Sequence, residues 1–196
     1  MLSRNSIYAI SVGVGIVLAA SAFVFFAPNN KLVTTTPVPN DALRADWKVV
    51  TTGDPKFSIS FPDTATHETQ NLTSPDGKMA IVRDTYMAQA DPSAVYFLQM
   101  LKYSVSLENN TEDALRILID GMVKTDANNE LISVKPIAVA GLRGMDFEIK
   151  DTKRDISYRG RVLVKAKILY QLYSAYETEQ FSQTDFDYFL NSFTVR

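Results

Sequence analysis

An uninterrupted apolar run near the start of the chain constrains its fold more than any other feature. The 21 residues from Ile7 to Ala27 contain no charged side chain, and only the short stretch 1–6 precedes them. A bilayer core of about 30 Å needs roughly 20 apolar residues in helical form. The run therefore predicts a transmembrane helix at 7–27 that holds the rest of the chain at a membrane surface.

The same run has a second interpretation, as a signal peptide that is removed. Ala20-Ser21-Ala22 matches a small-residue cleavage site, and an apolar stretch with a basic start precedes it. However, Phe23-Val24-Phe25-Phe26 continues the apolar run beyond that site and makes it long enough to span a bilayer. An uncleaved signal anchor is therefore the preferred interpretation.

Few charges flank the run, and they set its expected orientation. Arg4 and the α-amino group precede it, and Lys31 follows it closely. Cytoplasmic flanks are enriched in Lys and Arg, so this pattern weakly favours a cytoplasmic tail at 1–6. We expect a single-pass membrane protein whose C-terminal domain is periplasmic or extracellular.

Small residues recur within the run at four-residue spacing, at Ser11, Gly15 and Ala19. Such spacing places them on one face of a helix, where small side chains permit close packing against another helix. Small residues are also common in membrane spans in general, so the pattern is compatible with no packing role.

The chain after the run divides into a linker and one domain. Residues 28–46 begin with a stretch rich in proline, threonine and asparagine, which cannot build a buried face and stiffens the chain. Residues 47–196 number about 150, enough for one domain with one core. The chain after residue 30 holds all 22 acidic residues and all but one of the 20 basic ones, so it has no bulk positive field for nucleic acid.

The periodicity from residue 47 onward alternates between two and 3.6. We expect helices at Thr111–Lys124, with Thr111 as its cap, and at Asp185–Asn191. Residues 94–101 are apolar on both faces, which suits a central strand covered on two sides, with a short helix as the alternative. Expected strands are 57–61, 66–72 (an edge strand), 79–88, 94–101, 132–138, 145–149, 156–164 and 168–176. Antiparallel strands with helices before and after predict an α+β sandwich, with an antiparallel sheet and packed helices.

The order of these elements resembles the PsbP-like superfamily, and most of all its uncharacterised exported bacterial members. The family includes photosystem oxygen-evolving proteins and a Ran-binding nuclear import factor. The resemblance covers residues 47–196 and implies their fold, but it supplies no catalytic residue, because the matching residues are packing and turn residues. They are Phe57-Ser-Ile-Ser-Phe61-Pro62, Gly141-Leu-Arg-Gly144-Met-Asp-Phe147, Arg159-Gly-Arg161-Val-Leu-Val, Leu169-Tyr170-Gln-Leu and Phe186-Asp-Tyr-Phe189-Leu190-Asn-Ser192-Phe193.

No pattern in the sequence indicates a catalytic centre or a cofactor. The chain has no phosphate-binding glycine loop, no nucleophile elbow, no metal-binding helix signature and no cysteine. His67 is the only histidine and is interpreted as a surface residue. Asp146, Glu148 and Asp151 offer oxygen ligands for a divalent cation, although solvated strand charges are the simpler interpretation. We therefore expect a protein that is not an enzyme and holds no cofactor or metal.

One cluster of cations stands out as a candidate contact surface. Arg159, Arg161, Lys165 and Lys167 occupy alternate positions, so an undistorted strand would place them on one face. Such a face would suit an acidic protein partner or an anionic lipid surface. The alternative is a solvated face that keeps an edge strand soluble.

Two classes of function remain open from the sequence. The first is a non-catalytic, membrane-anchored interaction or accessory domain. The second is a protein that binds a small ligand or lipid in a pocket between sheet and helix, lined by Tyr96, Tyr170, Tyr173 or Tyr176. A deep apolar pocket would favour the second class, and a filled core with a flat surface patch the first.

Overall fold

The computed structural model of the protein describes residue 44 and residues 46–53, 55–73, 79–91, 94–108 and 111–195. The expected anchor at 7–27, its packing residues and the start of the linker lie outside these ranges. Within them, no helix combines the length and the apolar character needed to cross a bilayer.

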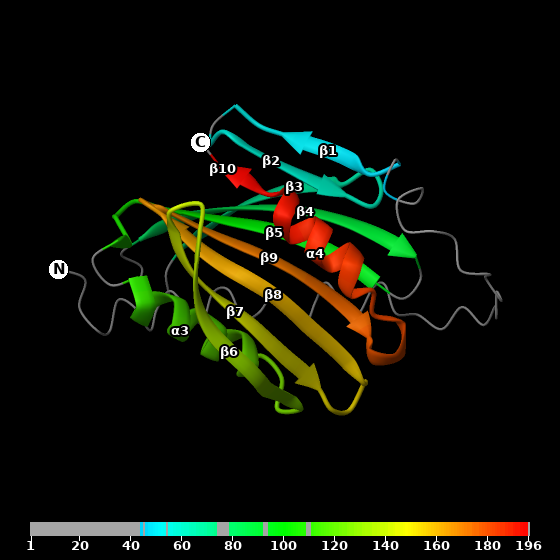
Figure 1. Cartoon of the computed structure of the whole chain (residues 1–196). Helices are drawn as coiled ribbons and strands as arrows, with labels where there is room; N and C mark the ends of the chain where they lie inside the picture. Colours follow the sequence, from blue (N-terminus) through cyan, green and yellow to red (C-terminus); the bar gives the residue numbers. More distant parts are fainter. Residues whose placement is uncertain are drawn as a thin grey trace.

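Antiparallel strands make up most of the described chain (Figure 1). The elements, in chain order, are β1 (Lys48–Thr51), β2 (Phe57–Phe61), β3 (Thr66–Thr73), β4 (Ala80–Asp91), β5 (Ala94–Tyr103), α3 (Thr111–Val123), β6 (Asn129–Val139), β7 (Leu142–Asp151), β8 (Ile156–Lys165), β9 (Ile168–Glu177), η2 (Thr178–Gln180), α4 (Gln183–Ser192) and β10 (Thr194–Val195). The eight strands expected from the sequence are all present, and the structure adds β1 and β10.

The strands form two sheets. A seven-stranded sheet has the order β3-β4-β5-β9-β8-β7-β6, and a three-stranded sheet has the order β1-β2-β10. Every neighbouring pair is antiparallel. Strand β3 is an edge strand and β5 is buried on both faces, as expected from their polar and apolar runs.

Each face of the large sheet has its own apolar core. On one face, α3 lies against β6, β7 and β8 and buries residues such as Leu118 and Phe147. On the other face, α4 and the small sheet bury residues such as Phe61, Phe189 and Tyr170 (Figure 1). Alternate strand residues point to opposite faces, so each central strand contributes to both cores. The α+β sandwich predicted from the sequence is confirmed.

The two helices begin differently from what their sequences suggest. Helix α4 begins at Gln183, where the Ser182 hydroxyl accepts a hydrogen bond from the backbone N–H of Asp185 (3.3 Å). Helix α3 begins at Thr111, whose hydroxyl instead donates to the carbonyl of Glu108 (3.0 Å). Thr111 is therefore the first helical residue and holds the preceding turn, and its predicted role as a cap is wrong.

Two glycines allow the β6–β7 hairpin to form. Gly141 has a φ of 78° in the turn, where a side chain would be strained. A Cβ at Gly144 would lie 2.3 Å from the carbonyl oxygen of Val162 on β8, so this position admits no side chain. Gly141 therefore shapes the β6–β7 turn, and Gly144 permits the close approach of β7 to β8.

Candidate functional site

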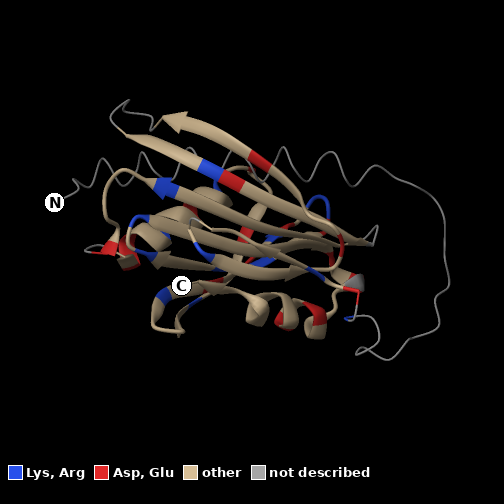
Figure 2. Ribbon diagram, turned by 90° about the horizontal axis from the view of Figure 1, so that it is seen from above, with Lys and Arg blue, Asp and Glu red and all other residues tan. Residues whose placement is uncertain are grey.

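The four cations predicted as one basic face occupy different surroundings. Arg159, Arg161 and Lys165 lie at alternate positions of β8, on the face that α4 covers in part. Lys167 lies beyond the strand, in the turn between β8 and β9. Figure 2 shows basic and acidic residues interspersed along the strands of the sheet.

The two arginines are engaged within the protein. Arg161 binds both carboxylate oxygens of Asp146 on β7, at 2.8 and 3.2 Å. The Arg159 guanidinium lies 5.4 Å from the ring centres of Phe181 and Phe186 and donates to the Gln183 side-chain oxygen (2.6 Å). These contacts tie β8 to β7 and to the start of α4.

The two lysines flank a turn that is held firmly in place. Among the described residues, neither Lys165 nor Lys167 forms an ion pair. The carbonyl of Lys167 accepts from the backbone N–H of Tyr103, and the carbonyl of Ala166 accepts from that of Leu107, both at 2.9 Å. We call the segment 165–167 the basic turn.

A carboxylate from the preceding segment completes the anchoring of the basic turn. The backbone N–H of Ala166 donates to the Glu108 side chain (3.2 Å), and Ala166 has a φ of 52°. Three hydrogen bonds from residues 103–108 therefore fix a backbone conformation that alanine adopts rarely. The basic turn presents its cations from a preformed scaffold.

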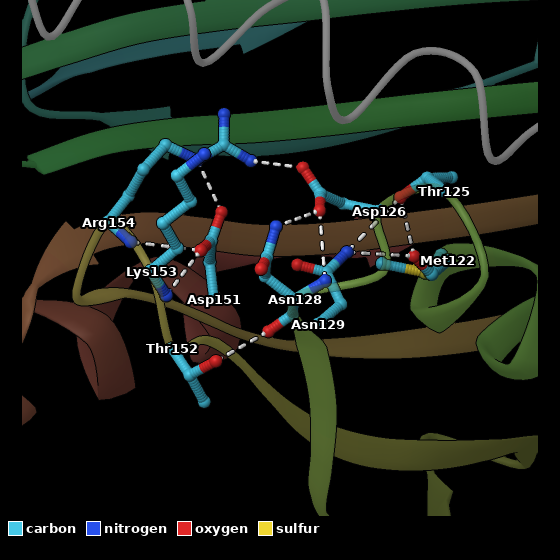
Figure 3. A network of polar contacts seen from close by, with 9 residues as sticks. All are labelled: Met122, Thr125, Asp126, Asn128, Asn129, Asp151, Thr152, Lys153 and Arg154. Carbon is cyan, nitrogen blue, oxygen red and sulfur yellow. Dashed lines mark hydrogen bonds and ion pairs between the residues drawn. The ribbon is translucent and has the colours of Figure 1, made fainter.

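Arg154, in the turn between β7 and β8, belongs to a structural network at the other end of the sheet (Figure 3). The fully buried carboxylate of Asp151 accepts from the Arg154 side chain and from the backbone N–H of Lys153 and Arg154, the last two at 3.0 Å. Arg154 also binds Asp126 in the loop after α3, at 3.0 Å. The amides of Asn128 and the charge of Arg154 hold the pKa of Asp126 below its ordinary value. This network fastens α3 to the sheet.

The three carboxylates considered for a cation are not brought together. Asp146 is paired with Arg161, and Asp151 lies within the network just described. Residues 146 and 151 differ in parity along β7, so their side chains point to opposite faces of the sheet. The described residues contain no group of three or more potential metal ligands.

A polar cluster around His67 is a feature that the sequence did not reveal. His67 stacks on Tyr86, with ring centres 4.2 Å apart, and its Nε2 lies 3.3 Å from Asp84. Asp84 also accepts from Thr69 (2.6 Å) and pairs with Lys102 (3.0 Å). These residues meet only through the register of β3, β4 and β5, which places residue 67 opposite 86 and residue 69 opposite 84. Burial raises the pKa of Asp84, but its partners outweigh burial and lower it.

The four tyrosines proposed as a pocket lining do not share one face. Tyr173 belongs to the core under α3, where it stacks on Phe97 at 4.7 Å. Tyr96, Tyr170 and Tyr176 belong to the other core. All four are at most 4% exposed. The structure therefore distributes them between two filled cores.

Comparison with known proteins identifies a fold but no family member by sequence. No family model and no curated protein matches the chain. The solution structure of cyanobacterial PsbP (CyanoP) from Synechocystis sp. PCC 6803 matches with a TM-score of 0.56 and 9% sequence identity, covering 86% of this chain and all of that one. A Pseudomonas aeruginosa protein of unknown function, PA94, matches at a TM-score of 0.38 and 10% identity, covering 68% of this chain and 85% of that one. The first likeness shows a PsbP-like fold, and the second is too distant to support an argument.

Proposed function

We propose that this chain is a membrane-tethered, non-catalytic binding domain that works outside the cytoplasm and contacts an acidic protein partner through the basic turn. The tether is the apolar run Ile7–Ala27, whose length suits a single span. The linker at 28–46 contains three prolines and, at about 3 Å per residue, reaches up to roughly 60 Å. Tethering confines the domain near the membrane and raises its effective concentration towards a membrane-bound partner.

The anchored geometry of the basic turn carries this proposal. Lys165 and Lys167 present two cations without an internal carboxylate partner among the described residues. Their backbone is held by hydrogen bonds from residues 103–108, so little conformational entropy is lost when a partner binds. Cations on a fixed backbone can match carboxylates at a fixed spacing on a protein surface. A fluid membrane offers no fixed spacing, so lysines on a flexible segment would bind it equally well.

Charge reversal at the turn tests the contact surface. We expect the full-length double variant Lys165→Glu/Lys167→Glu to fold normally, because exposed charges contribute little to stability. Electrostatic partners of the parent are those proteins that cross-link to it in intact membranes at low salt and no longer do so at high salt. The double variant should not cross-link to these proteins at low salt. Lys48→Glu/Lys56→Glu, which makes the same charge change at two exposed lysines of the small-sheet region, is the matched control and should keep them.

Three results contradict the proposal in different ways. A folded Lys165→Glu/Lys167→Glu variant that keeps every partner shows that the basic turn is only a solvated surface. If the double variant loses binding to protein-free anionic vesicles to the same extent as it loses its partners, the turn binds lipid headgroups instead. Recovery of a soluble chain that begins near Phe23 after carbonate washing refutes the tether.

A further inference from the structure

The two edges of the large sheet differ in how they are protected against pairing with another chain. Strand β6 contains Lys135 and Pro136 and has a register shift between Leu131 and Ser133. Lysine, proline and bulges are features by which native edge strands resist such pairing. Strand β3, at the other edge, contains no proline and no lysine, and its ladder with β4 runs from residue 66 to residue 73 without a shift. Strand β3 is therefore the unprotected edge.

Strand β3 is also suited to accept a further strand. Six of its eight residues are exposed, and Thr66, Thr69 and Thr73 are β-branched residues that favour a strand. Among the described strands it pairs only with β4. Alternate residues of β3 therefore direct their backbone N–H and C=O groups away from β4, where no described strand accepts them.

Two charged residues at this edge lack an ion pair within the described part of the chain. Arg83 on β4 is 7% exposed, and its Nη2 donates to the side chain of Gln70, which lies opposite it on β3. Glu68 is exposed on the same face of β3 and accepts only from Gln70. Burial lowers the pKa of Arg83, against the weaker opposing effect of Glu68. A second carboxylate near Arg83 would further offset the cost of burying its charge.

Symmetry restricts how two copies of β3 can pair with each other. A two-fold axis perpendicular to the sheet keeps each face on the same side in both copies, so residues that lie opposite one another are both odd or both even. Most of the strand pairs in only two registers, residues 66–72 about Thr69 or residues 67–73 about Gln70. The second register places Glu68 opposite Leu72, which packs against the core under α3. The first places Glu68 opposite the partner's Gln70.

The register centred on Thr69 also brings opposite charges together. Neighbouring strands are about 5 Å apart, so the Cα of Glu68 in one copy would lie about 10 Å from the Cα of the partner's Arg83. Two side chains of this length span that separation, and the symmetry repeats the contact. No like charges face each other in this register, because the other opposed pairs are Thr66 with Leu72, His67 with Asn71 and Thr69 with itself.

We propose that two copies of this chain pair along β3 in the register centred on Thr69, so that their large sheets join into one continuous sheet. Backbone hydrogen bonds between the strands supply the contact, and the two Glu68–Arg83 approaches fix its register. A strand pair of this length is smaller than a standard interface of about 800 Å² per partner, so we expect a dimer that dissociates on dilution. Strands β4 and β5 separate β3 from the β8–β9 hairpin, so this contact is independent of the basic turn.

Single cysteines report the pairing directly, because the chain has none of its own. Thr69→Cys in the full-length protein would place two cysteines opposite each other, with Cα atoms about 4.5–5.5 Å apart, which is within disulfide range. We expect a disulfide-linked dimer after mild oxidation of isolated membranes. Thr73→Cys, exposed on the same face of β3, is the matched control. Its two copies would lie roughly 27 Å apart in the proposed register and should not cross-link.

Charge reversal tests the register by a second measurement, sedimentation equilibrium of the full-length protein in detergent. Glu68→Lys would place a cation near the partner's Arg83, and we expect the dissociation constant of the dimer to rise at least tenfold. Glu130→Lys makes the same change at an exposed residue of β6, the other edge, and should stay within twofold of the parent. Thermal unfolding of each variant without cross-linking checks that the fold is kept.

Four results overturn the proposal. One is the absence of a disulfide-linked dimer from folded Thr69→Cys. Another is equal cross-linking of Thr69→Cys and Thr73→Cys, which indicates collision between copies that are held together elsewhere. A dissociation constant that is unchanged in Glu68→Lys also assigns the dimer to another contact, such as the apolar run 7–27. Finally, a cross-linked product of Thr69→Cys that contains a different protein assigns the edge to a strand of that protein.

Discussion

Arg161 and Asp146 form a two-point ion pair across β8 and β7, with Nε 2.8 Å from Oδ1 and Nη2 3.2 Å from Oδ2. The arginine side chain is only 14% exposed, while the carboxylate is 39% exposed. A bidentate pair of this kind fixes both side chains and directs the guanidinium inward. The pair therefore withdraws one cation of β8 from the surface.

Loss of the carboxylate from this pair should weaken the domain. Asp146→Asn leaves Arg161 largely buried without a full counter-charge, and we expect the free energy of unfolding to fall by about 1 kcal/mol, because the pair is only partly shielded from solvent. Glu148→Gln changes the next carboxylate on the same face of β7, which has no ion pair among the described residues, and should change stability by less than about 0.5 kcal/mol. Urea unfolding of both variants measures the difference, and equal losses would deny the pair any specific role.

The ring of Phe189 should be essential for docking α4. It is fully buried, 5.5 Å from the ring centre of Phe61 on β2 and 5.1 Å from that of Tyr96 on β5. Phe189→Ala should lower the free energy of unfolding by about 3–5 kcal/mol, because it leaves a cavity between the small sheet and the large one. Thr184→Ala on the exposed side of α4 is the control. A loss below about 1 kcal/mol would show that α4 is not docked as described.

A single methyl group at Gly144 should disrupt the pairing of β7 with β8. Its carbon would meet the carbonyl oxygen of Val162 at 2.3 Å, and a backbone atom cannot move aside cheaply. We expect Gly144→Ala to cost about 1–3 kcal/mol in thermal or urea unfolding. Gly53→Ala provides the comparison, because no atom lies within 4 Å of the added carbon there. Unchanged stability of Gly144→Ala would mean that the two strands are further apart than the structure shows.

Asp84 should make the stability of the domain depend on pH in the acid range. Burial raises the pKa of this carboxyl, but Thr69 and Lys102 outweigh that effect and hold it below its ordinary value of 3.8. A carboxyl with a lowered folded-state pKa stabilises the fold above its unfolded-state pKa, and that contribution is lost as the pH falls through the folded value. Asp84→Asn should therefore be less stable than the parent at pH 7, with a difference that shrinks below about pH 3.8.

Urea unfolding at a series of pH values from 7 to 3 measures this linkage. Glu130→Gln, which neutralises an exposed carboxylate on β6, serves as the control for general charge effects. A difference between Asp84→Asn and the parent that stays constant over the whole range would exclude Asp84 as the source.

The strands could be predicted from sequence because their side-chain alternation reports burial directly. Phe57, Ile59 and Phe61 alternate with polar residues and form β2, whereas the continuous apolar run of β5 reflects a strand with helices or a second sheet on both faces. The short strands β1 and β10 have four and two residues and owe their pairing to β2, so no local pattern could indicate them.

The candidate sites could be predicted less well, because they depend on register between strands. Spacing alone placed Arg159 and Arg161 on one face, but it could not show Asp146 opposite Arg161 or the rings beside Arg159. A glutamine or tyrosine within an apolar strand, such as Gln99 on β5 or Tyr173 on β9, gives no sign of whether its polar atom finds a partner.

The pairing of β2 with β10 has a consequence for how the domain folds during its synthesis. Residue 57 pairs with residue 195, and the backbone N–H of Ser60 bonds the Ser192 hydroxyl at 2.9 Å, so almost the whole domain lies between the two partners. Pairing between strands so far apart in the sequence forms slowly. At 5–20 residues per second, the apolar side chains of β2 emerge roughly 7–28 s before β10 exists to cover their strand edge. A fusion placed directly after residue 196 would compete with that final pairing, whereas the N-terminal end of the chain carries no such constraint from β10.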